Sequence, residues 1–197
     1  MPYTNEEIIE LLRVDAELYS KYAGSWLEFL HSKSKNSPLQ KNVIYFGQEH
    51  FMHLVGVKSK TYYAAEFYEH CLDRSIEIED CTPVHDAKNR NEKVSTFPKL
   101  FDFARSAIYK IGEKDLSTAY DDFFIATGNS DGTIGYDFRD INSDHPFPVT
   151  LLTRPLWYYC SEANRILAVA QKFEDGSSRV VFEIRKGLYE GLTAGII

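Results

Sequence analysis

Apolar residues near the start of the chain recur at helical spacing. The residues of this stripe are Ile8, Leu12, Tyr19, Tyr22, Trp26 and Leu30. Because positions three or four apart share one face of an α-helix, the stripe predicts one or two amphipathic helices over residues 5 to 31. Thr4 and Glu7 have the spacing of a capping box, which marks the helix start, and Gly24 is the expected break.

The middle of the chain alternates short predicted elements with polar connections. Residues 42 to 47 are typical of a short strand between turn formers, and residues 61 to 73 favour a helix. Residues 82 to 96 have almost no apolar content, so we expect a surface loop there. Helical spacing returns between Phe97 and Ile111, and Pro98 suits the first turn of that helix.

From Phe123 onward the hydrophobic period changes to two, which indicates β-strands. The candidate strands are residues 123–126, 133–139, 149–154, 165–173 and 179–186. The short glycine-containing segments 129–132 and 174–177 predict hairpins and therefore antiparallel pairing. We expect one α+β domain over residues 1–197, with N-terminal helices (about 1–115) packed on one face of a C-terminal antiparallel sheet (about 120–187) of four to five strands.

Composition narrows the class of protein. The 197 residues are 44% hydrophobic and carry a formal net charge of −7, which suits a globular chain and argues mildly against non-specific duplex binding. No apolar run is long enough to span a membrane and the N-terminus lacks a signal-peptide pattern, so we expect a cytoplasmic protein without membrane contact. The three cysteines are odd in number and widely spaced, which predicts reduced, packed thiols.

The most distinctive segment follows the predicted strand at 42–47 and runs Phe51-Met52-His53-Leu54-Val55-Gly56-Val57-Lys58. Its Phe-x-His-Leu-x-Gly core resembles the signature of the phage-associated barnase-EndoU-colicin-RelE-like RNases. The order of elements is similar to that family from Ile8 to Lys186. The resemblance implies a toxin-like or phage-defence-related endoribonuclease that needs no metal or cofactor. It also implies that His53 is the family's histidine and Lys58 the basic residue after the glycine.

The other site residues are inferred from chemistry. Metal-free RNA cleavage needs a proton acceptor, a proton donor and fixed cations, and histidine and arginine supply these groups. One face of the predicted sheet offers Arg139, Arg154 and Glu183 for catalysis, and Arg179 and Arg185 for RNA binding. The alternative for this face is cross-strand ion pairing on a solvated surface. For His53 the alternative is a packed side chain that hydrogen-bonds to backbone.

Other functions remain open at this point. An acidic chain without activity could bind a toxin, a nuclease or a phage component. An ADP-ribosyltransferase-like enzyme also has a histidine at a strand end and a C-terminal glutamate. His50 and His53 form a His-x-x-His pair, but the Glu of a zinc-protease motif is missing. For the nuclease, the expected partners are RNA as substrate and a cognate antitoxin or phage protein. The oligomeric state is left undetermined.

Overall fold

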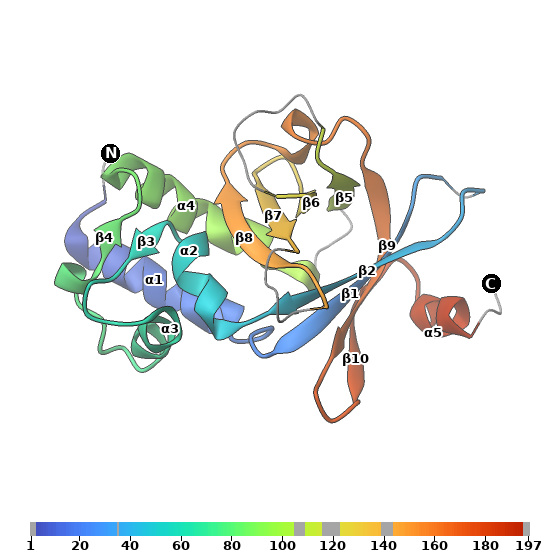
Figure 1. Cartoon of the computed structure of the whole chain (residues 1–197). Coiled ribbons are helices and arrows are strands. Elements are labelled where there is room, and N and C mark those ends of the chain that lie inside the picture. Colours follow the sequence, from blue (N-terminus) through green and yellow to red (C-terminus); the bar gives the residue numbers. More distant parts are fainter. Residues whose placement is uncertain (1–2, 35, 105–108, 116–122, 139–143, 195–197) are drawn as a thin grey trace.

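The computed structural model describes residues 3–34, 36–104, 109–115, 123–138 and 144–194. Its helices are α1 (Asn5–Tyr19), α2 (Phe51–Leu54), α3 (Ala64–Leu72), α4 (Ala87–Leu100) and α5 (Leu188–Thr193), with short 3-10 turns η1 (Gln48–His50), η2 (Ile78–Asp80) and η4 (Leu156–Tyr158). Helices α1 to α4 gather on one side of a curled sheet, and α5 lies on the other side (Figure 1).

The first helix begins as the sequence predicts but ends earlier. Thr4 Oγ1 accepts a hydrogen bond from Glu7 N at 3.2 Å, and Thr4 N donates to the Glu7 carboxylate at 2.7 Å, so the capping box is confirmed. The helix ends at Tyr19, and Gly24, with φ +73°, lies at the break. The prediction of helix up to residue 31 was wrong, because the next segment is a strand. Apolar and polar residues do not alternate along this strand, since both of its faces are covered.

One large antiparallel sheet dominates the fold. Its order is β2-β1-β9-β5-β6-β7-β8, and β10 also pairs with β9. The strands are β1 (Ser25–Ser32), β2 (Gln40–Phe46), β5 (Lys110–Glu113), β6 (Ile125–Gly128), β7 (Thr133–Asp137), β8 (Phe147–Leu152), β9 (Asn164–Lys172) and β10 (Ser178–Glu183). The sheet curls so far that Tyr45 N, in β2, donates to Pro146 O just before β8 at 2.9 Å.

The five predicted C-terminal strands and both hairpins are confirmed as β6 to β10, and the strand at 42–47 is confirmed as part of β2. The expected total of four to five strands was too low. Strands β1, β2 and β5 come from the part of the chain that was assigned to helices, and β1 and β5 pair directly with β9. Sequence-distant strands therefore complete the sheet, which local periodicity does not reveal.

Helix α3 confirms the helix expected at 61–73, whereas α4 contradicts the loop expected at 82–96. Of the helix expected from Phe97 to Ile111, only the part up to Leu100 is helical, as the end of α4; its last two residues belong to β5, and residues 105–108 lie outside the described residues. Asp86 caps α4 by accepting from Asn89 N at 2.7 Å, and Pro98 lies in the last turn. The polar composition misled the prediction because the buried face of α4 includes the long basic side chains of Arg90 and Lys93. A two-stranded ribbon, β3 (Val57–Lys58) with β4 (Thr82–Pro83), precedes this helix.

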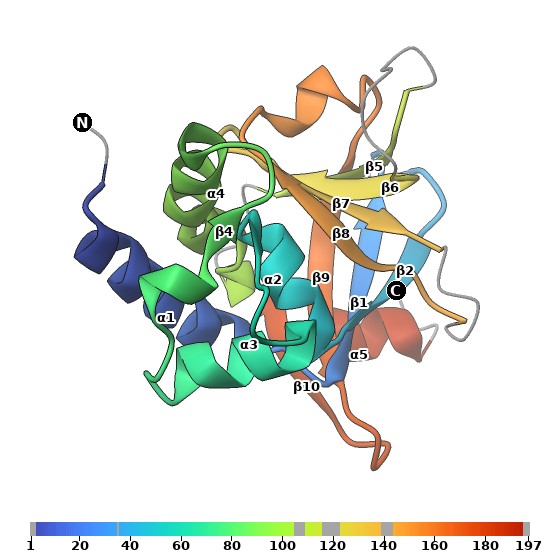
Figure 2. The ribbon, with the colours of Figure 1, turned by 60° about the vertical axis from the view of Figure 1, so that its left-hand side comes forward.

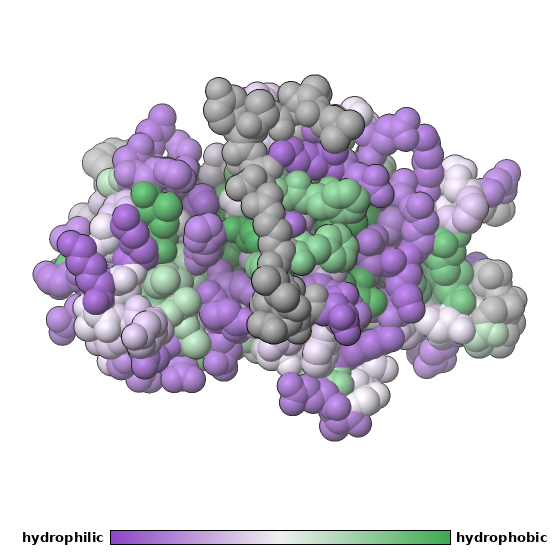
Figure 3. Space-filling model, in the orientation of Figure 1, coloured by the Kyte–Doolittle hydropathy of each residue, from purple (hydrophilic) through white to green (hydrophobic). Residues whose placement is uncertain are grey.

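An aromatic cluster joins the helices to the sheet. The ring of Tyr19 lies within 6.2 Å of five other ring centroids, those of Phe46, Phe51, Tyr68, Phe97 and Phe101. All three cysteines are buried and free, as predicted. On the face drawn in Figure 3 the surface is mainly hydrophilic, and hydrophobic side chains gather near its centre, over the sheet. None of the helices within the described ranges is long and apolar enough to cross a membrane.

Candidate active site

The Phe-x-His-Leu-x-Gly segment forms α2 and the turn that follows it. Phe51 and Leu54 are fully buried, so they fix the short helix on the aromatic cluster, and His53 points to the exposed side. Gly56 has φ +71°, a left-handed conformation that favours glycine over residues with a Cβ. The Gly56 N–H donates to His53 O at 3.1 Å, which closes the turn after the histidine.

The same glycine brings α4 close to α2. A Cβ on Gly56 would lie 2.8 Å from Lys93 Cδ and 3.6 Å from Arg90 Cα, so only a glycine leaves room for the Lys93 side chain. The Gly56 carbonyl accepts from Val84 N at 2.9 Å, which holds the segment containing His85 against the motif. Figures 1 and 2 show α2, β4 and α4 side by side.

His53, His85 and Lys93 form what we call the basic cluster. The pKa of His53 lies below its ordinary value for three reasons. Desolvation by the surrounding protein has the largest effect, followed by the charges of Lys93 and His85. Both neighbours therefore lie close enough to disfavour a protonated His53 ring. Lys93 is only 8% exposed, whereas His53 and His85 are exposed. A neutral imidazole next to a fixed cation can accept a proton near a bound phosphate.

The other predicted site residues that the structure describes lie on different elements from the basic cluster. Lys58 follows the motif on β3 and is exposed. Glu183 accepts from Gly187 N at 2.7 Å and from Tyr189 N at 3.2 Å, so it fixes the start of α5. Arg179 donates to Gln171 Oε1 at 2.9 Å and to the Lys21 carbonyl. Both residues lie on β10, which extends away from α2 (Figure 1).

The three remaining predicted residues are arginines. Arg154 is exposed and stacks over the Tyr158 ring at 4.3 Å from its centroid. Arg185 is exposed in the turn between β10 and α5. Arg139 lies outside the described residues. Thus the two basic side chains near His53 are those of Lys93 and His85, which come from α4 and the segment before it rather than from the sheet.

Sequence reasoning missed His85 and Lys93. A signal was available: Asp86 and Asn89 have N-cap spacing, and a helical stripe follows at Arg90, Lys93, Val94 and Phe97. All four residues of that stripe are buried, although two of them are basic. Basic residues on the buried stripe of a helix are a reason to look for a site, because burying a cation is costly unless something offsets it.

The histidine pair His50 and His53 does not form a metal site with the groups around it. His50 Nδ1 accepts from Gly47 N at 3.1 Å, and its ring stacks on Phe147 with centroids 4.6 Å apart. Across the ranges that the structure describes, no three His, Cys, Asp or Glu side chains are grouped to hold a metal ion.

Comparison with known proteins gives one match. A family model described as phage-Barnase-EndoU-ColicinE5/D-RelE like nuclease4 matches residues 12–186. The match covers most of the chain and includes α2, β3, β4 and α4, and it confirms the resemblance found in the motif. No curated protein and no solved structure matches.

Proposed function

The chain belongs to the phage-Barnase-EndoU-ColicinE5/D-RelE like nuclease4 family, and from this premise we propose that it is a metal-independent endoribonuclease with its active site at the basic cluster. The observation that carries the proposal is the exposed His53 of the motif, held beside Lys93 and His85 with its pKa lowered. In a chain with a net charge of −7, such a local group of basic side chains is a suitable place for a phosphate.

The proposed reaction assigns one task to each group. Neutral His53 takes the proton from the ribose 2′-hydroxyl, and the 2′-oxygen attacks the neighbouring phosphorus. Lys93 stabilises the negative charge that develops on the phosphorane oxygens. His85, in its protonated form, gives a proton to the departing 5′-oxygen. The products are a 2′,3′-cyclic phosphate and a 5′-hydroxyl, with no net change in protons, so neither an oxidant nor a metal is required.

The remaining predicted residues have lesser roles in this proposal. Lys58 is close in sequence to the motif and exposed, so it can contact the phosphate backbone next to the cluster. Arg154 with Tyr158 offers a guanidinium and an aromatic face, a combination that suits single-stranded RNA. The hydrogen bonds of Glu183 and Arg179 favour structural roles for these two residues.

The test is cleavage of single-stranded RNA by the purified chain in EDTA, with the products identified by mass spectrometry. We expect a 2′,3′-cyclic phosphate end, and no cleavage where the attacked ribose is replaced by deoxyribose. His53→Gln should lower the rate by about 10²- to 10⁴-fold, the usual contribution of a general base. His70→Gln is the matched control, since His70 lies on α3 and bonds to Ser75.

Two outcomes in which RNA is cut would overturn the proposal. One is a His53→Gln variant that cuts RNA at the wild-type rate. The other is cleavage that appears only after a divalent metal is added. If the folded chain cuts no RNA at all, its net charge of −7 favours the second candidate, a protein that binds a basic toxin, nuclease or phage component. Expression in bacteria with and without His53→Gln extends the test, because only an active toxin-like RNase slows growth through His53.

A further inference from the structure

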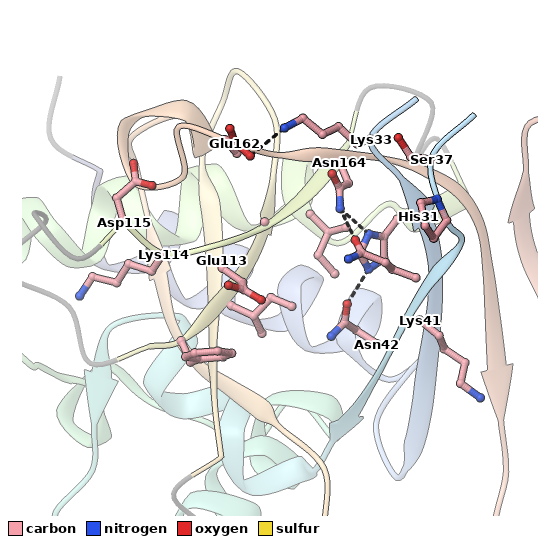
Figure 4. Close-up of a pocket in the computed structure, with 16 residues that line it drawn as sticks. His31, Lys33, Ser37, Lys41, Asn42, Glu113, Lys114, Asp115, Glu162 and Asn164 are labelled. Carbon is pink, nitrogen blue, oxygen red and sulfur yellow. Dashed lines mark hydrogen bonds and ion pairs between the residues drawn. The ribbon is translucent and has the colours of Figure 1, made fainter. Parts of the chain in front are cut away.

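A cavity of about 750 Å³ opens on the sheet, away from the basic cluster (Figure 4). The start of β2 at Gln40 lines it, whereas His53 follows the other end of β2. The remaining walls come from the end of β1 and the loop after it, from β5, from Phe124 and the start of β6, and from the start of β9. Its volume lies in the range of pockets that hold small organic molecules.

The deepest polar group of the cavity is His31, which is only 5% exposed. Its Nε2 lies 2.6 Å from Asn42 Oδ1 and its Nδ1 lies 3.0 Å from Asn164 Nδ2 (Figure 4). Because Asn164 Nδ2 also donates to Gln40 Oε1 at 2.6 Å, the consistent arrangement has His31 Nε2–H donating to Asn42 and Nδ1 accepting from Asn164. Burial lowers the pKa of His31, which agrees with a neutral ring.

The charges around the cavity balance. Three lysines and three carboxylates line it: Lys33, Lys41, Lys114, Glu113, Asp115 and Glu162. Lys33 pairs with Glu162 at 2.9 Å, Lys41 lies 3.7 Å from the buried Glu28, and Lys114 lies over the Phe123 ring. A site for a polyanion would show an excess of uncompensated cations. This cavity instead suits a neutral, polar and flat molecule.

Two amide groups and one aromatic ring supply the contacts that such a molecule needs. Within the described part of the chain, Asn42 Nδ2 and Asn164 Oδ1 have no hydrogen-bond partner, which leaves one donor and one acceptor in residues that line the cavity. Phe124 also lines the cavity and is 53% exposed, although it is a large apolar side chain. Single-stranded RNA is recognised in this way, by stacking on aromatic rings and by hydrogen bonds to the edges of splayed bases.

We propose that this cavity binds a nucleobase of single-stranded RNA, with Phe124 stacking on the base and Asn42 and Asn164 bonding to its edge. The inference rests on the proposed function, since it gives the nuclease a base-binding site separate from the phosphate site at the basic cluster. Each of the four bases presents neighbouring donors and acceptors on its pairing edge. His31 acts as a positioning residue, because it holds both asparagine side chains in place.

The experiment measures binding of 5′-AMP, 5′-GMP, 5′-CMP and 5′-UMP to the full chain by calorimetry and by NMR chemical shifts. We expect at least one to bind in the millimolar range or tighter. Phe124→Leu should weaken that binding about tenfold, because stacking on an aromatic face is lost, and Asn42→Asp should weaken it as well. Tyr63→Leu, at the N-cap of α3, is the matched control, since Tyr63 is 84% exposed and does not line the cavity. Phe124 and Tyr63 are exposed, so both leucine variants should fold, which a thermal melt checks.

The variants separate this inference from the proposed function. His53→Gln should bind the nucleotide as the wild type does, even though it cuts RNA about 10²- to 10⁴-fold more slowly. Binding that depends on Phe124 and Asn42 supports the base site even if no RNA is cleaved by any variant. The inference is overturned if no nucleotide binds, or if Phe124→Leu and Asn42→Asp bind as tightly as the wild type. RNA cleavage that still depends on His53 would then leave the proposed function standing.

Discussion

Replacing Gly56 by alanine tests how the motif builds the basic cluster. The backbone at Gly56 is left-handed, with φ +71°, and a Cβ there would lie 2.8 Å from Lys93 Cδ. The substitution therefore has two effects, backbone strain and displacement of the Lys93 stem. A second glycine separates them. Gly176, in the β9–β10 turn, has φ +81° and nothing within 4 Å of a Cβ, so Gly176→Ala introduces strain alone.

The magnitudes follow from these two effects. A left-handed alanine costs about 1–2 kcal/mol, and forcing an extra carbon into a packed contact costs about 1–3 kcal/mol more. We expect Gly176→Ala to lower the free energy of unfolding by about 1–2 kcal/mol, and Gly56→Ala by about 2–5 kcal/mol. For a chain of this length 1 kcal/mol corresponds to a Tm shift of about 2–4 °C. Gly56→Ala should also slow RNA cleavage by up to about 100-fold, because an ångström of misplacement at an active site has effects of that size.

Urea denaturation gives the two stabilities, and a fluorogenic RNA substrate gives the rates. NMR titration of His53 provides a readout that does not depend on cleavage, because Lys93 contributes to its lowered pKa. Gly176→Ala should leave both the rate and the His53 titration unchanged. The reasoning is refuted if the two variants lose the same stability and Gly56→Ala keeps both the wild-type rate and the wild-type titration of His53.

Three further predictions concern buried or neighbouring charges. Since the pKa of His53 is lowered, base catalysis should persist to a lower pH than an unperturbed histidine would allow. Lys93→Gln should move the low-pH loss of activity, and the pKa of His53 measured by NMR, to higher pH. An unmoved pKa would exclude the charge of Lys93 as a cause of the lowered His53 pKa. Asp15 is fully buried, its pKa is raised well above the usual value by burial, and neither carboxylate oxygen has a hydrogen-bond partner within the described residues. The folded state thus binds a proton that the unfolded state releases, and stability falls as the pH rises from about 4 towards the folded pKa. In urea denaturation, Asp15→Asn should raise the free energy of unfolding by about 1–3 kcal/mol at pH 7 and by less at pH 4. An equal gain at both pH values would contradict this reasoning. Burial would raise the pKa of Glu28, but hydrogen bonds from Lys172 and Tyr189 lower it overall. The stability that Glu28 contributes is therefore present above its unfolded pKa of about 4.3 and is lost as the pH falls through the folded pKa. Glu28→Gln should lower the free energy of unfolding by about 1–3 kcal/mol at pH 7 and speed hydrogen exchange in α5. Unchanged exchange would show that α5 is held by other contacts.

Parts of the candidate site could be found from the sequence because their signals are local. The Phe-x-His-Leu-x-Gly motif, which spans only a few residues, singled out His53 as the candidate histidine. His85 and Lys93 were missed because α4 was taken for a loop. Only the tertiary structure, in which Gly56 lies against α4, brings His85 and Lys93 from separate segments close to His53. The cavity was equally hidden, since His31 and Asn164 are 133 positions apart and meet through the pairing of β1 with β9.

The sequence by itself determined the elements whose stabilising interactions lie within a few residues. Thr4 and Glu7 fix the start of α1, and the glycine-containing turns fix the hairpins β6–β7 and β9–β10. The tertiary structure decided that residues 25–32 form a strand and that the face of α4 carrying Arg90 and Lys93 is buried. Trp26 and Leu30 have helical spacing, but β1 becomes a strand because β2 and β9 satisfy its backbone on both sides. Helix α4 holds basic side chains on its buried face because neighbouring segments cover them, and such long-range contacts are not encoded in local periodicity.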